Sequence, residues 1–279
     1  MIKSILLAVD GSVYTDAVVE HGIDLAKKLD AFVRVCSVVD IRIYEWVLNT
    51  GGEGYMPVIP SNVFHDESYK FHSERADGLI TSLKKKLEGS GVRFEADKIE
   101  GSPVEVICDI SRQVDLVIMG ARGDYARWGD RMLGTTLEPV SHQIHSPLMI
   151  ADRKYIDFKR ISCAYDRSAT SNSSLRLSAY LATKLRLPLD VLTIHEDENE
   201  RKETLEEAKI YLKAYELDSK FRHEAGDVVK IISEMTTEHA DSTLLMMGSY
   251  GHSRIREAIL GSTTLQVMRQ AAKPILLSR

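Results

Sequence analysis

The sequence of 279 residues has few cysteines and no long apolar run. Its three cysteines, Cys36, Cys108 and Cys163, are scattered and form no C-x-x-C pair, so we expect reduced, partly buried thiols without a metal or redox role. The apolar stretch 5–9 is too short for a signal peptide, and no stretch approaches the roughly 18 apolar residues of a membrane span. We therefore expect a cytoplasmic protein with no membrane partner.

Other common signals of function are also missing. Basic residues form no block and the formal net charge is -5, which argues against a nucleic-acid partner. The sequence contains no P-loop motif G-x-x-x-x-G-K-[ST], no nucleophile motif G-x-S-x-G and no histidine pair at metal-ligand spacing. We therefore expect no catalytic residues, no metal cluster, and binding chemistry with slow hydrolysis or none.

The sequence does contain an internal repeat. Three landmarks recur in the same order: ILLAVDGS at 5–12 and ISCAYDRS at 161–168, DLVIMGARG at 115–123 and STLLMMGSYG at 242–251, HSPLMIADR at 145–153 and AKPILLSR at 272–279. This pattern indicates a tandem duplication. The offset falls from 156 between the first landmarks to 128 between the second, so the first half carries 28 extra residues. We place them in the Gly- and Pro-rich segment 40–66, as a long loop that is either a lid, an interface or a surface insertion.

Each half alternates short apolar, β-branched runs with longer amphipathic stretches, which predicts an α/β fold with a parallel sheet covered on both faces. Strands are expected at 4–9, 32–39, 92–99, 116–119 and 147–151, and again at 160–165, 189–195, 219–224, 243–247 and 275–277. Helices are expected at 16–29, 66–87, 103–112 and 137–144, and again at 169–185, 200–215, 228–238 and 264–271.

The glycines of the second half predict a phosphate cradle. Gly248 follows a buried strand, Gly251 comes one turn later, and Gly261, Ser262 and Thr263 directly precede a helix. Glycine allows a sharp turn and close approach to main-chain N–H groups. A helix start capped by Ser or Thr offers further N–H donors and the positive end of a dipole, which favours phosphate.

An aspartate ends the first strand of each half, Asp10 in the first and Asp166 in the second. If the strand order is 3-2-1-4-5, strands one and four are neighbours where the order reverses, and ligands bind at such points. Asp166 and Gly248 then face one crevice, with a nucleoside on the aspartate side and phosphates on the glycine side. Each feature alone is also explained by an ordinary turn or helix cap. Their joint placement, twice in one chain, favours a site.

The spacing G-x-x-G, nine residues, then G-[ST] resembles the nucleotide signature of ATP-binding universal stress proteins. The strand-ending Asp and the terminal P-[VI]-L strand also fit, over nearly the whole chain. The resemblance implies two tandem Rossmann-like units, 1–153 and 158–279, each with strand order 3-2-1-4-5 and helices on both faces. It also implies that the tandem mimics the homodimer of single-domain members, with the strands 148–151 and 275–277 pairing across the interface. We further expect a homodimer of tandem chains and an unidentified protein partner.

Carried over to the second half, the resemblance assigns adenosine contacts to Asp166 and ribose and phosphate contacts to Gly248, Gly251, Gly261 and Ser262, with Thr263 adding to the phosphate contacts. Arg167 departs from the pattern, because the first half has Gly11 at this place. It either binds phosphate or obstructs the mouth of the site.

In the first half, the matching residues are Asp10, Gly11, Ser12, Gly120, Gly123, Gly134 and Thr135. Ten residues rather than nine separate the two glycine turns there, and Asp124 and Asp130 add negative charge near the expected phosphates. We therefore rank the second half above the first as a nucleotide site.

The leading prediction is a stress-response sensor or regulatory module that binds ATP or a related adenine nucleotide, with or without Mg²⁺. One alternative is a scaffold for dimerisation and partner binding without nucleotide, which Arg167 and the ten-residue gap favour. The other is a weak ATP-hydrolysing enzyme. It would need a carboxylate or a metal at the phosphates, for which Asp124 and Asp130 are the nearby candidates.

Overall fold

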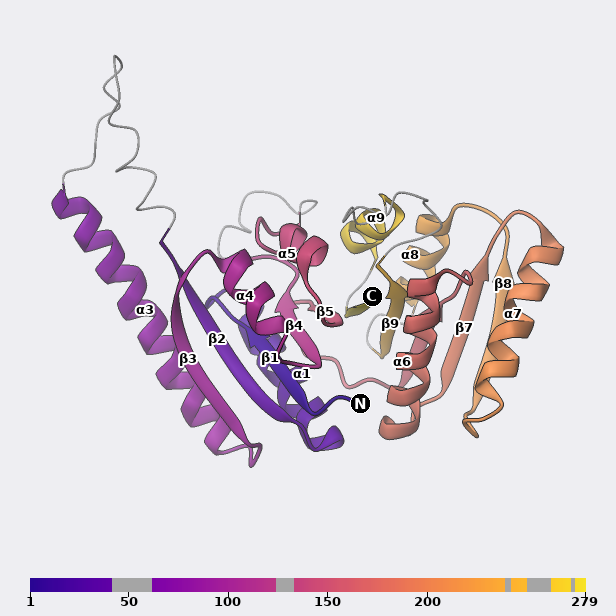
Figure 1. Cartoon of the computed structure of the whole chain (residues 1–279), viewed down its shortest axis with the longest axis horizontal. Coiled ribbons are helices and arrows are strands. Elements are labelled where there is room, and N and C mark those ends of the chain that lie inside the picture. Colours follow the sequence, from indigo (N-terminus) through magenta and orange to yellow (C-terminus); the bar gives the residue numbers. More distant parts are fainter. Residues whose placement is uncertain (42–61, 124–132, 239–241, 250–261, 272–273) are drawn as a thin grey trace, which may run out of the picture.

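The computed structural model describes residues 1–41, 62–123, 133–238, 242–249, 262–271 and 274–279, except the side chains of 62–66 and 238 (Figure 1). The described strands are β1 (Ser4–Ala8), β2 (Phe32–Asp40), β3 (Phe94–Gly101), β4 (Leu116–Gly120), β5 (Leu148–Ala151), β6 (Arg160–Ala164), β7 (Leu189–Ile194), β8 (Ser219–Glu224), β9 (Thr243–Gly248) and β10 (Ile275–Ser278). The described helices are α1 (Thr15–Leu29), α3 (Asn62–Glu88), α4 (Pro103–Ser111), α5 (Leu137–Gln143), α6 (Ala169–Leu185), α7 (Glu198–Leu212), α8 (Val228–Glu238) and α9 (Ser262–Gln270).

The strands form one continuous sheet in the order β3-β2-β1-β4-β5-β10-β9-β6-β7-β8. Each half taken alone has the expected order 3-2-1-4-5, with parallel pairs throughout. The two halves join through β5 and β10, which pair antiparallel with Leu276 opposite Met149. The expected pairing of the two last strands is confirmed, and it merges the two predicted five-stranded sheets into one.

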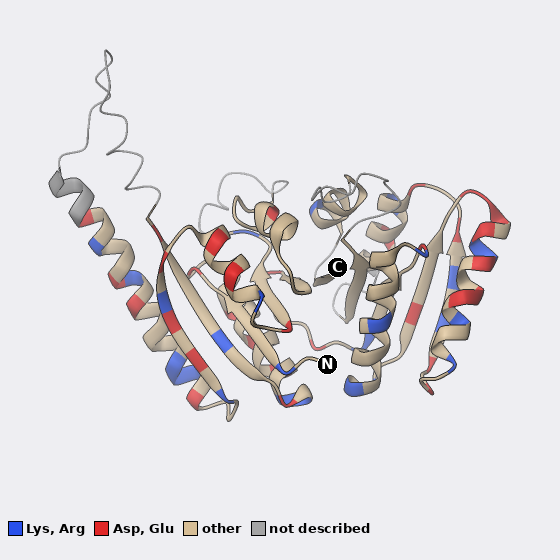
Figure 2. Ribbon diagram, in the orientation of Figure 1, with Lys and Arg blue, Asp and Glu red and all other residues tan. Residues whose placement is uncertain are grey.

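Two helical layers cover this sheet, which explains why its central strands are apolar without alternation. In β1, Ile5, Leu6 and Leu7 are all fully buried. Ile5 and Leu7 belong to the core cluster that includes residues of α1, α3, α6 and α7. Leu6 belongs to the opposite cluster, with residues of α4, α5, α8 and α9. In Figure 2 the central strands are almost free of charged residues, which lie on the outer helices and edge strands.

The segment expected as a long loop at 40–66 is shorter than predicted. Strand β2 runs to Asp40, and α3 begins at Asn62 rather than at Asp66. Ser61 and Asn62 are residue types that favour helix starts, which agrees with the earlier start of the helix. Residues 42–61 lie outside the described part of the chain. The expected lid, interface or surface insertion in this segment therefore stays a prediction.

The short connection between the halves packs onto α1. The ring of His21 stacks on Phe158 with centres 5.2 Å apart and lies 4.9 Å from the ring of Tyr155. Elsewhere along the seam, the Tyr180 hydroxyl accepts a hydrogen bond from the backbone N–H of Ile2 at 3.1 Å. The halves therefore contact each other through side chains as well as through the sheet.

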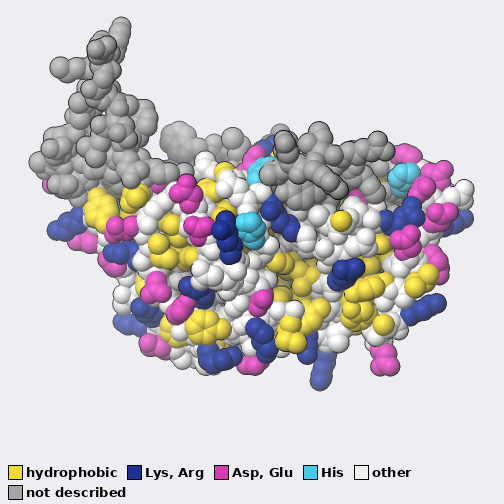
Figure 3. Space-filling view, in the orientation of Figure 1, with side chains coloured by type: hydrophobic (Ala, Val, Ile, Leu, Met, Phe, Trp, Pro, Cys, Tyr) yellow, Lys and Arg dark blue, Asp and Glu magenta, His cyan; other side chains and the backbone are white. Residues whose placement is uncertain are grey.

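The face shown in Figure 3 carries acidic and basic side chains interspersed around apolar ones. None of the described helices is both long and apolar enough to cross a membrane.

Candidate functional site

The two aspartates predicted for the site occupy equivalent turns. Asp10 Oδ1 accepts a hydrogen bond from the N–H of Ser12 at 3.0 Å, and Asp166 Oδ1 accepts one from the N–H of Ser168 at 3.1 Å. Both turns lie at the carboxyl end of the first strand of their half, next to the fourth strand. Each aspartate therefore holds its own turn with one carboxylate oxygen.

In the first half, the structure brings the predicted aspartate and both glycine turns together. A Cβ atom on Gly123 would lie only 2.7 Å from Oδ2 of Asp10, so the carboxylate sits directly against this glycine. The N–H of Gly134 donates to the Ala121 carbonyl oxygen at 3.2 Å, and a Cβ atom on Gly134 would lie 3.0 Å from Cα of Arg122. Side chains at 123 or 134 would force these groups apart, so glycine permits the close approach here.

The glycines that end the fourth strands have packing roles of their own. A Cβ atom on Gly120 would lie 2.6 Å from Cβ of Tyr14. On Gly248, it would lie 2.8 Å from the backbone nitrogen of Ser171 and 2.5 Å from Oγ1 of Thr170. Both glycines thus let the start of the first helix of their half, α1 or α6, pack closely against the end of the fourth strand, whether or not they also contact a ligand.

The predicted helix start in the second half needs a correction. Helix α9 begins at Ser262, so Ser262 and Thr263 form its first turn instead of capping a helix that starts at 264. Both residues are exposed. The Oγ1 atom of Thr264 donates to the Gly248 carbonyl oxygen at 3.5 Å and ties this helix end to the end of β9. The N–H groups of the first turn of α9, which have no partner within the helix itself, therefore lie near the end of β9.

The corresponding residues of the first half precede α5. Thr135 is exposed and lies with Thr136 in a turn that leads into the helix. The N–H of Glu138 donates to the Gly134 carbonyl oxygen at 3.3 Å, so the turn and the helix are continuous. Gly251 and Gly261, together with Asp124 and Asp130, lie outside the described residues.

The turn after the first strand differs between the halves in sequence but not in conformation. Gly11 has a φ of 75° and Arg167 has a φ of 63°, so both occupy the left-handed region. The N–H of Gly11 donates to Oγ1 of Thr15 at 3.1 Å, and the Arg167 carbonyl oxygen accepts from the amide of Asn172 at 3.2 Å. Arginine pays a conformational cost at this place that glycine does not.

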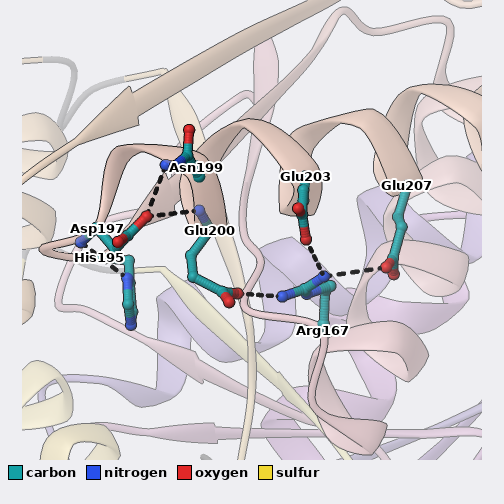
Figure 4. A network of polar contacts seen from close by, with 7 residues as sticks. All are labelled: Arg167, His195, Asp197, Asn199, Glu200, Glu203 and Glu207. Atoms are coloured by element: carbon teal, nitrogen blue, oxygen red, sulfur yellow. Dashed lines mark hydrogen bonds and ion pairs between the residues drawn. The ribbon is translucent and has the colours of Figure 1, made fainter.

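Arg167 is held by α7 (Figure 4). Its guanidinium pairs with Glu200, with Glu207 at 3.2 Å and with Glu203 at 3.7 Å. Hydrogen bonding to Glu207, followed by the nearby carboxylate charges, raises the pKa of Arg167 above its usual value. The alternatives left open for Arg167 were phosphate binding or obstruction of the mouth. The structure adds a third role, a tie between the turn and α7.

The N-terminus of α7 is itself well capped (Figure 4). Asp197 Oδ1 accepts hydrogen bonds from the N–H groups of Asn199 at 2.7 Å and Glu200 at 3.1 Å. These backbone hydrogen bonds hold the pKa of Asp197 below its usual value. These hydrogen bonds stabilise the start of the helix that presents the three glutamates.

Comparison with known proteins assigns the family. The model of the universal stress protein family matches residues 1–152 and 157–279. The chain belongs to the universal stress protein family. A universal stress protein of Synechocystis sp. is 26% identical over 289 residues, which span 99% of this chain and 100% of that protein. One of Methanocaldococcus jannaschii is 27% identical over 154 residues, 54% of this chain and 82% of that protein.

Solved structures of universal stress proteins share the fold. One from Archaeoglobus fulgidus superposes with a TM-score of 0.77 at 23% identity and covers 99% of this chain and 98% of that one. A second, described as a putative universal stress protein from Pseudomonas aeruginosa, has a TM-score of 0.66 at 13% identity and covers 99% and 93%. The tandem universal stress protein architecture expected from the sequence is confirmed.

Sequence reasoning missed two residues beside the predicted site of the first half in this universal stress protein. Arg75 of α3 lies over the turn, with Nη2 donating to the Gly11 carbonyl oxygen at 3.4 Å. Arg153, after β5, places its guanidinium carbon 5.8 Å from the centre of the Tyr14 ring. Neither contact has a signal in the sequence, because both depend on how separate elements pack.

The cysteines of this universal stress protein are free and buried, as expected. Burial raises the pKa of Cys36 to about 12 and that of Cys163 to about 11, which disfavours the reactive thiolate. Among the residues that the structure describes, no group of three or more His, Cys, Asp or Glu side chains is arranged to hold a metal ion.

Proposed function

We propose that this universal stress protein binds ATP or a related adenine nucleotide at the carboxyl ends of the first and fourth strands of its halves, as a sensor or regulatory module. The observation that carries the proposal is the contact of Asp10 with Gly123, beside Gly134. A carboxylate and two glycine turns in one mouth provide an acceptor for ribose or adenine and N–H donors for phosphates. The adenine moiety rests on the likeness of the glycine spacing to that of ATP-binding members.

The first half supports the proposal more directly than the ranking from the sequence implied. Its aspartate and both glycine turns are described and lie together, in spite of the ten-residue gap. In the second half, Asp166, Gly248, Ser262 and Thr263 are described, and the Thr264 hydrogen bond brings two of the elements together. The proposal therefore covers both halves.

The scaffold alternative retains one supporting observation. Arg167 has a complete structural explanation in its contacts with α7, without any ligand. This favours a second half whose role is to bind the first half or a partner. The hydrolysis alternative depends on Asp124 and Asp130, outside the described residues. A homodimer of tandem chains stays a prediction, and it would need a surface other than β5 and β10, which already pair within one chain.

Matched carboxylate variants test nucleotide binding in each half. Thr135→Glu and Ser262→Glu place a negative charge where each half is expected to bind phosphate, at exposed positions. A carboxylate near a helix N-terminus does not disfavour folding. We expect calorimetry with ATP to show binding to the unmodified chain, at least tenfold weaker binding at the altered half in each single variant, and none in the double variant.

Thr183→Glu is the control for this experiment. Thr183 is exposed and lies in the last turn of α6, at the opposite edge of the sheet. The Thr183→Glu variant should bind ATP as the unmodified chain does. No ATP binding to the unmodified chain, or binding to the double variant with unchanged affinity, would contradict the proposed function.

A further inference from the structure

Helix α3 is longer than its counterpart in the second half. It has 27 residues and α7 has 15, although each packs on the second and third strands of its own half. Asn62, where α3 begins, lies 25 residues before the last buried leucine of the helix, Leu87, whereas Glu198 lies only 14 residues before Leu212 in α7. Helix α3 therefore starts eleven residues earlier, and none of the described side chains in this extension, at 67–72, is buried.

Hydrogen bonds hold the first half of α3 on the edge strand β3. The Tyr69 hydroxyl donates to the carboxylate of Glu100, and Nζ of Lys98 donates to Oγ of Ser73 at 2.9 Å and to Oδ2 of Asp77 at 2.7 Å. In Figure 1, α3 lies along the outer side of the first half. The contacts with β3 therefore fix which side of α3 faces away from the sheet.

The side of α3 that faces away from the core follows a regular spacing. Residues three and four apart lie on one side of a helix, and the core side of α3 is formed by the buried residues Ala76, Ile80, Leu83 and Leu87. Alternating spacings of four and three also connect the exposed residues on the opposite side, a pattern typical of the contact line between two paired helices. We call these residues the outer face of α3: Glu67, Phe71, Glu74, Gly78, Thr81 and Lys85.

Phe71 is the large apolar side chain of this outer face. It is 62% exposed, and its ring meets only the edge of the neighbouring His72 ring among the aromatic contacts of the described residues, with centres 5.5 Å apart. A single exposed apolar side chain is ordinary in a soluble protein. Phe71 gains its significance from Gly78, which lies two turns further along the same face.

Gly78 has no explanation within the described part of the chain. A glycine inside an exposed helix weakens that helix, and a Cβ atom at this position would meet no described atom within 4 Å. Aligned on the buried leucines, α7 has Glu203 and Glu206 where α3 has Gly78 and Thr81. Long side chains are therefore compatible with the fold at these positions, and the short ones of α3 leave room for a group from outside.

The charges of the outer face are opposite at its two ends. Glu67 lies at one end and Lys85 at the other, 18 residues apart. If two copies of α3 pair antiparallel, Glu67 of each copy lies opposite Lys85 of the other. The same register places each Phe71 beside Thr81 and Gly78 of the second copy. The outer face is thus complementary to itself in charge and in shape, as a two-fold contact requires.

Glu74 is the one residue of the outer face that opposes this pairing. The two copies of Glu74 lie near the two-fold axis, where like charges repel. Lys70 lies 3.9 Å from the Glu74 carboxylate on the same helix, and this ion pair offsets part of the repulsion. Because Glu74 stands opposite Gly78 in this register, its side chain also has room to turn toward solvent.

We propose that the outer face of α3 is the surface through which two copies of this chain associate, as an antiparallel and two-fold symmetric pair of α3 helices. The proposal goes beyond nucleotide binding and does not depend on it. It supplies the surface that the predicted homodimer needs, since β5 and β10 are already paired within one chain. One helix face per copy makes a small contact, so we expect a dissociation constant on the order of 10–100 µM.

Phe71→Glu tests the apolar contact. Sedimentation equilibrium over a range of concentrations should show dimers of the unmodified chain and at least tenfold weaker association of the variant, because the ring is replaced by a charge. Ile210→Glu is the matched control, since Ile210 is 60% exposed on α7 at the place that corresponds to Lys85. It should leave association unchanged. An equal loss in both variants would overturn the proposal.

Gly78→Gln separates a contact role of the glycine from a role in folding. Glutamine favours a helix more than glycine does, so the thermal midpoint of the dilute, monomeric chain should rise by about 1–3 °C. The added side chain occupies the place of Phe71 from the second copy, so association should weaken at least threefold. Unchanged association in this variant would contradict the proposed register.

A mixture of two cysteine variants tests the antiparallel arrangement. In the proposed pair, residue 67 lies opposite residue 85 of the other copy, whereas equal residues lie about 27 Å apart, at 1.5 Å per residue. An equimolar mixture of Glu67→Cys and Lys85→Cys should therefore form a disulfide-linked dimer on mild oxidation, and each variant alone should not. The native cysteines are buried and should not interfere.

Three results would overturn the proposal. They are cross-linking of one cysteine variant alone to the same extent as the mixture, association that persists unchanged in Phe71→Glu, and an unmodified chain that stays monomeric at about 0.5 mM, well above the expected dissociation constant. The last result would mean that this face is open or binds something other than a second copy. None of them bears on nucleotide binding, which calorimetry with ATP tests separately.

Discussion

At the scale of single residues, positions 11 and 167 have the same left-handed backbone conformation but different residue types, glycine and arginine. Both turns have a positive φ, 75° at Gly11 and 63° at Arg167. For a residue with a side chain, this conformation costs about 1–2 kcal/mol. In the second half, the ion pairs of Arg167 with α7 help to offset that cost. In the first half, Arg75 occupies the space where such partners would lie.

Gly11→Arg should therefore destabilise the protein, whereas Arg167 is tolerated. The substitution adds left-handed strain, and its Cβ atom would lie 3.3 Å from the Arg75 guanidinium. We expect the free energy of unfolding to fall by about 1–2 kcal/mol from strain, and further from repulsion at low salt. Chemical denaturation measures this. Gly91→Arg is the control, since Gly91 has a φ of 77° and no atom within 4 Å of its Cβ position. Equal losses of unfolding free energy in both variants would show that Arg75 does not contribute to the destabilisation in Gly11→Arg.

His21 links the stability of the fold to pH. It is fully buried, and neither ring nitrogen has a hydrogen-bond partner among the described residues. Burial lowers its pKa from 6.5 to about 4. The unfolded chain binds a proton near pH 6.5, whereas the folded chain does so only near pH 4. Lowering the pH through this window therefore favours unfolding, by up to about 3 kcal/mol, and the full stability is present above pH 6.5.

His21→Phe should remove most of this pH dependence. Phenylalanine keeps a ring between Tyr155 and Phe158 and has no site for a proton. Urea unfolding at about pH 7.5 and about pH 5 should show a smaller loss of stability in the variant than in the unmodified chain. His145→Phe, at an exposed histidine, should leave the pH dependence unchanged. A loss between the two pH values equal to that of the unmodified chain would refute the role of His21.

At the scale of elements, the sequence predicts the existence and order of helices and strands better than their ends. The bounds of α6, β8 and α8 agree with the expected ones. Apolar periodicity defines the two helices, whereas β8, SKFRHE, contains Phe221 as its one apolar residue. Helices α3 and α9 begin earlier than expected, at Asn62 and Ser262. In both, residues that favour a helix start lie inside the helix, which adds about one turn to α3 and two residues to α9.

The candidate site is also predictable from the sequence only in part. The contact of Asp10 with Gly123 follows from strand order, because the carboxyl ends of neighbouring parallel strands meet at one edge. The position of Arg75 over Gly11 could not be predicted, since it depends on how α3 packs against the turn after β1. Arg167 stands out in the sequence as an exception to the repeat, but its partners on α7 come from a helix more than thirty residues away.

At the scale of the whole molecule, the halves are joined by more than the connecting segment. The antiparallel pair of β5 and β10 crosses the seam. Arg269 of α9 pairs with Glu138 of α5 at 3.1 Å, and Arg279 donates to the His142 carbonyl oxygen. These contacts link the end of the second half to the helix α5 of the first.

A cut between the halves should therefore leave them associated. A protease site inserted after Lys154, an exposed residue, allows cleavage in the folded protein. The cleaved sample should elute from a sizing column at the volume of the uncut chain, because buried strand pairing and side-chain contacts hold the seam. A denaturing gel confirms that cleavage is complete. Two separate peaks would mean that the connecting segment alone holds the halves together.

The seam between β5 and β10 has a consequence for how the two sites can evolve. Two identical subunits share one coding sequence, so every substitution appears at both sites at once. Fusing the halves keeps their mutual arrangement but lets each site mutate alone, as Gly11 and Arg167 already show. The chain thus carries two unequal versions of the proposed site in a fixed one-to-one ratio, without any need to control the expression of two genes.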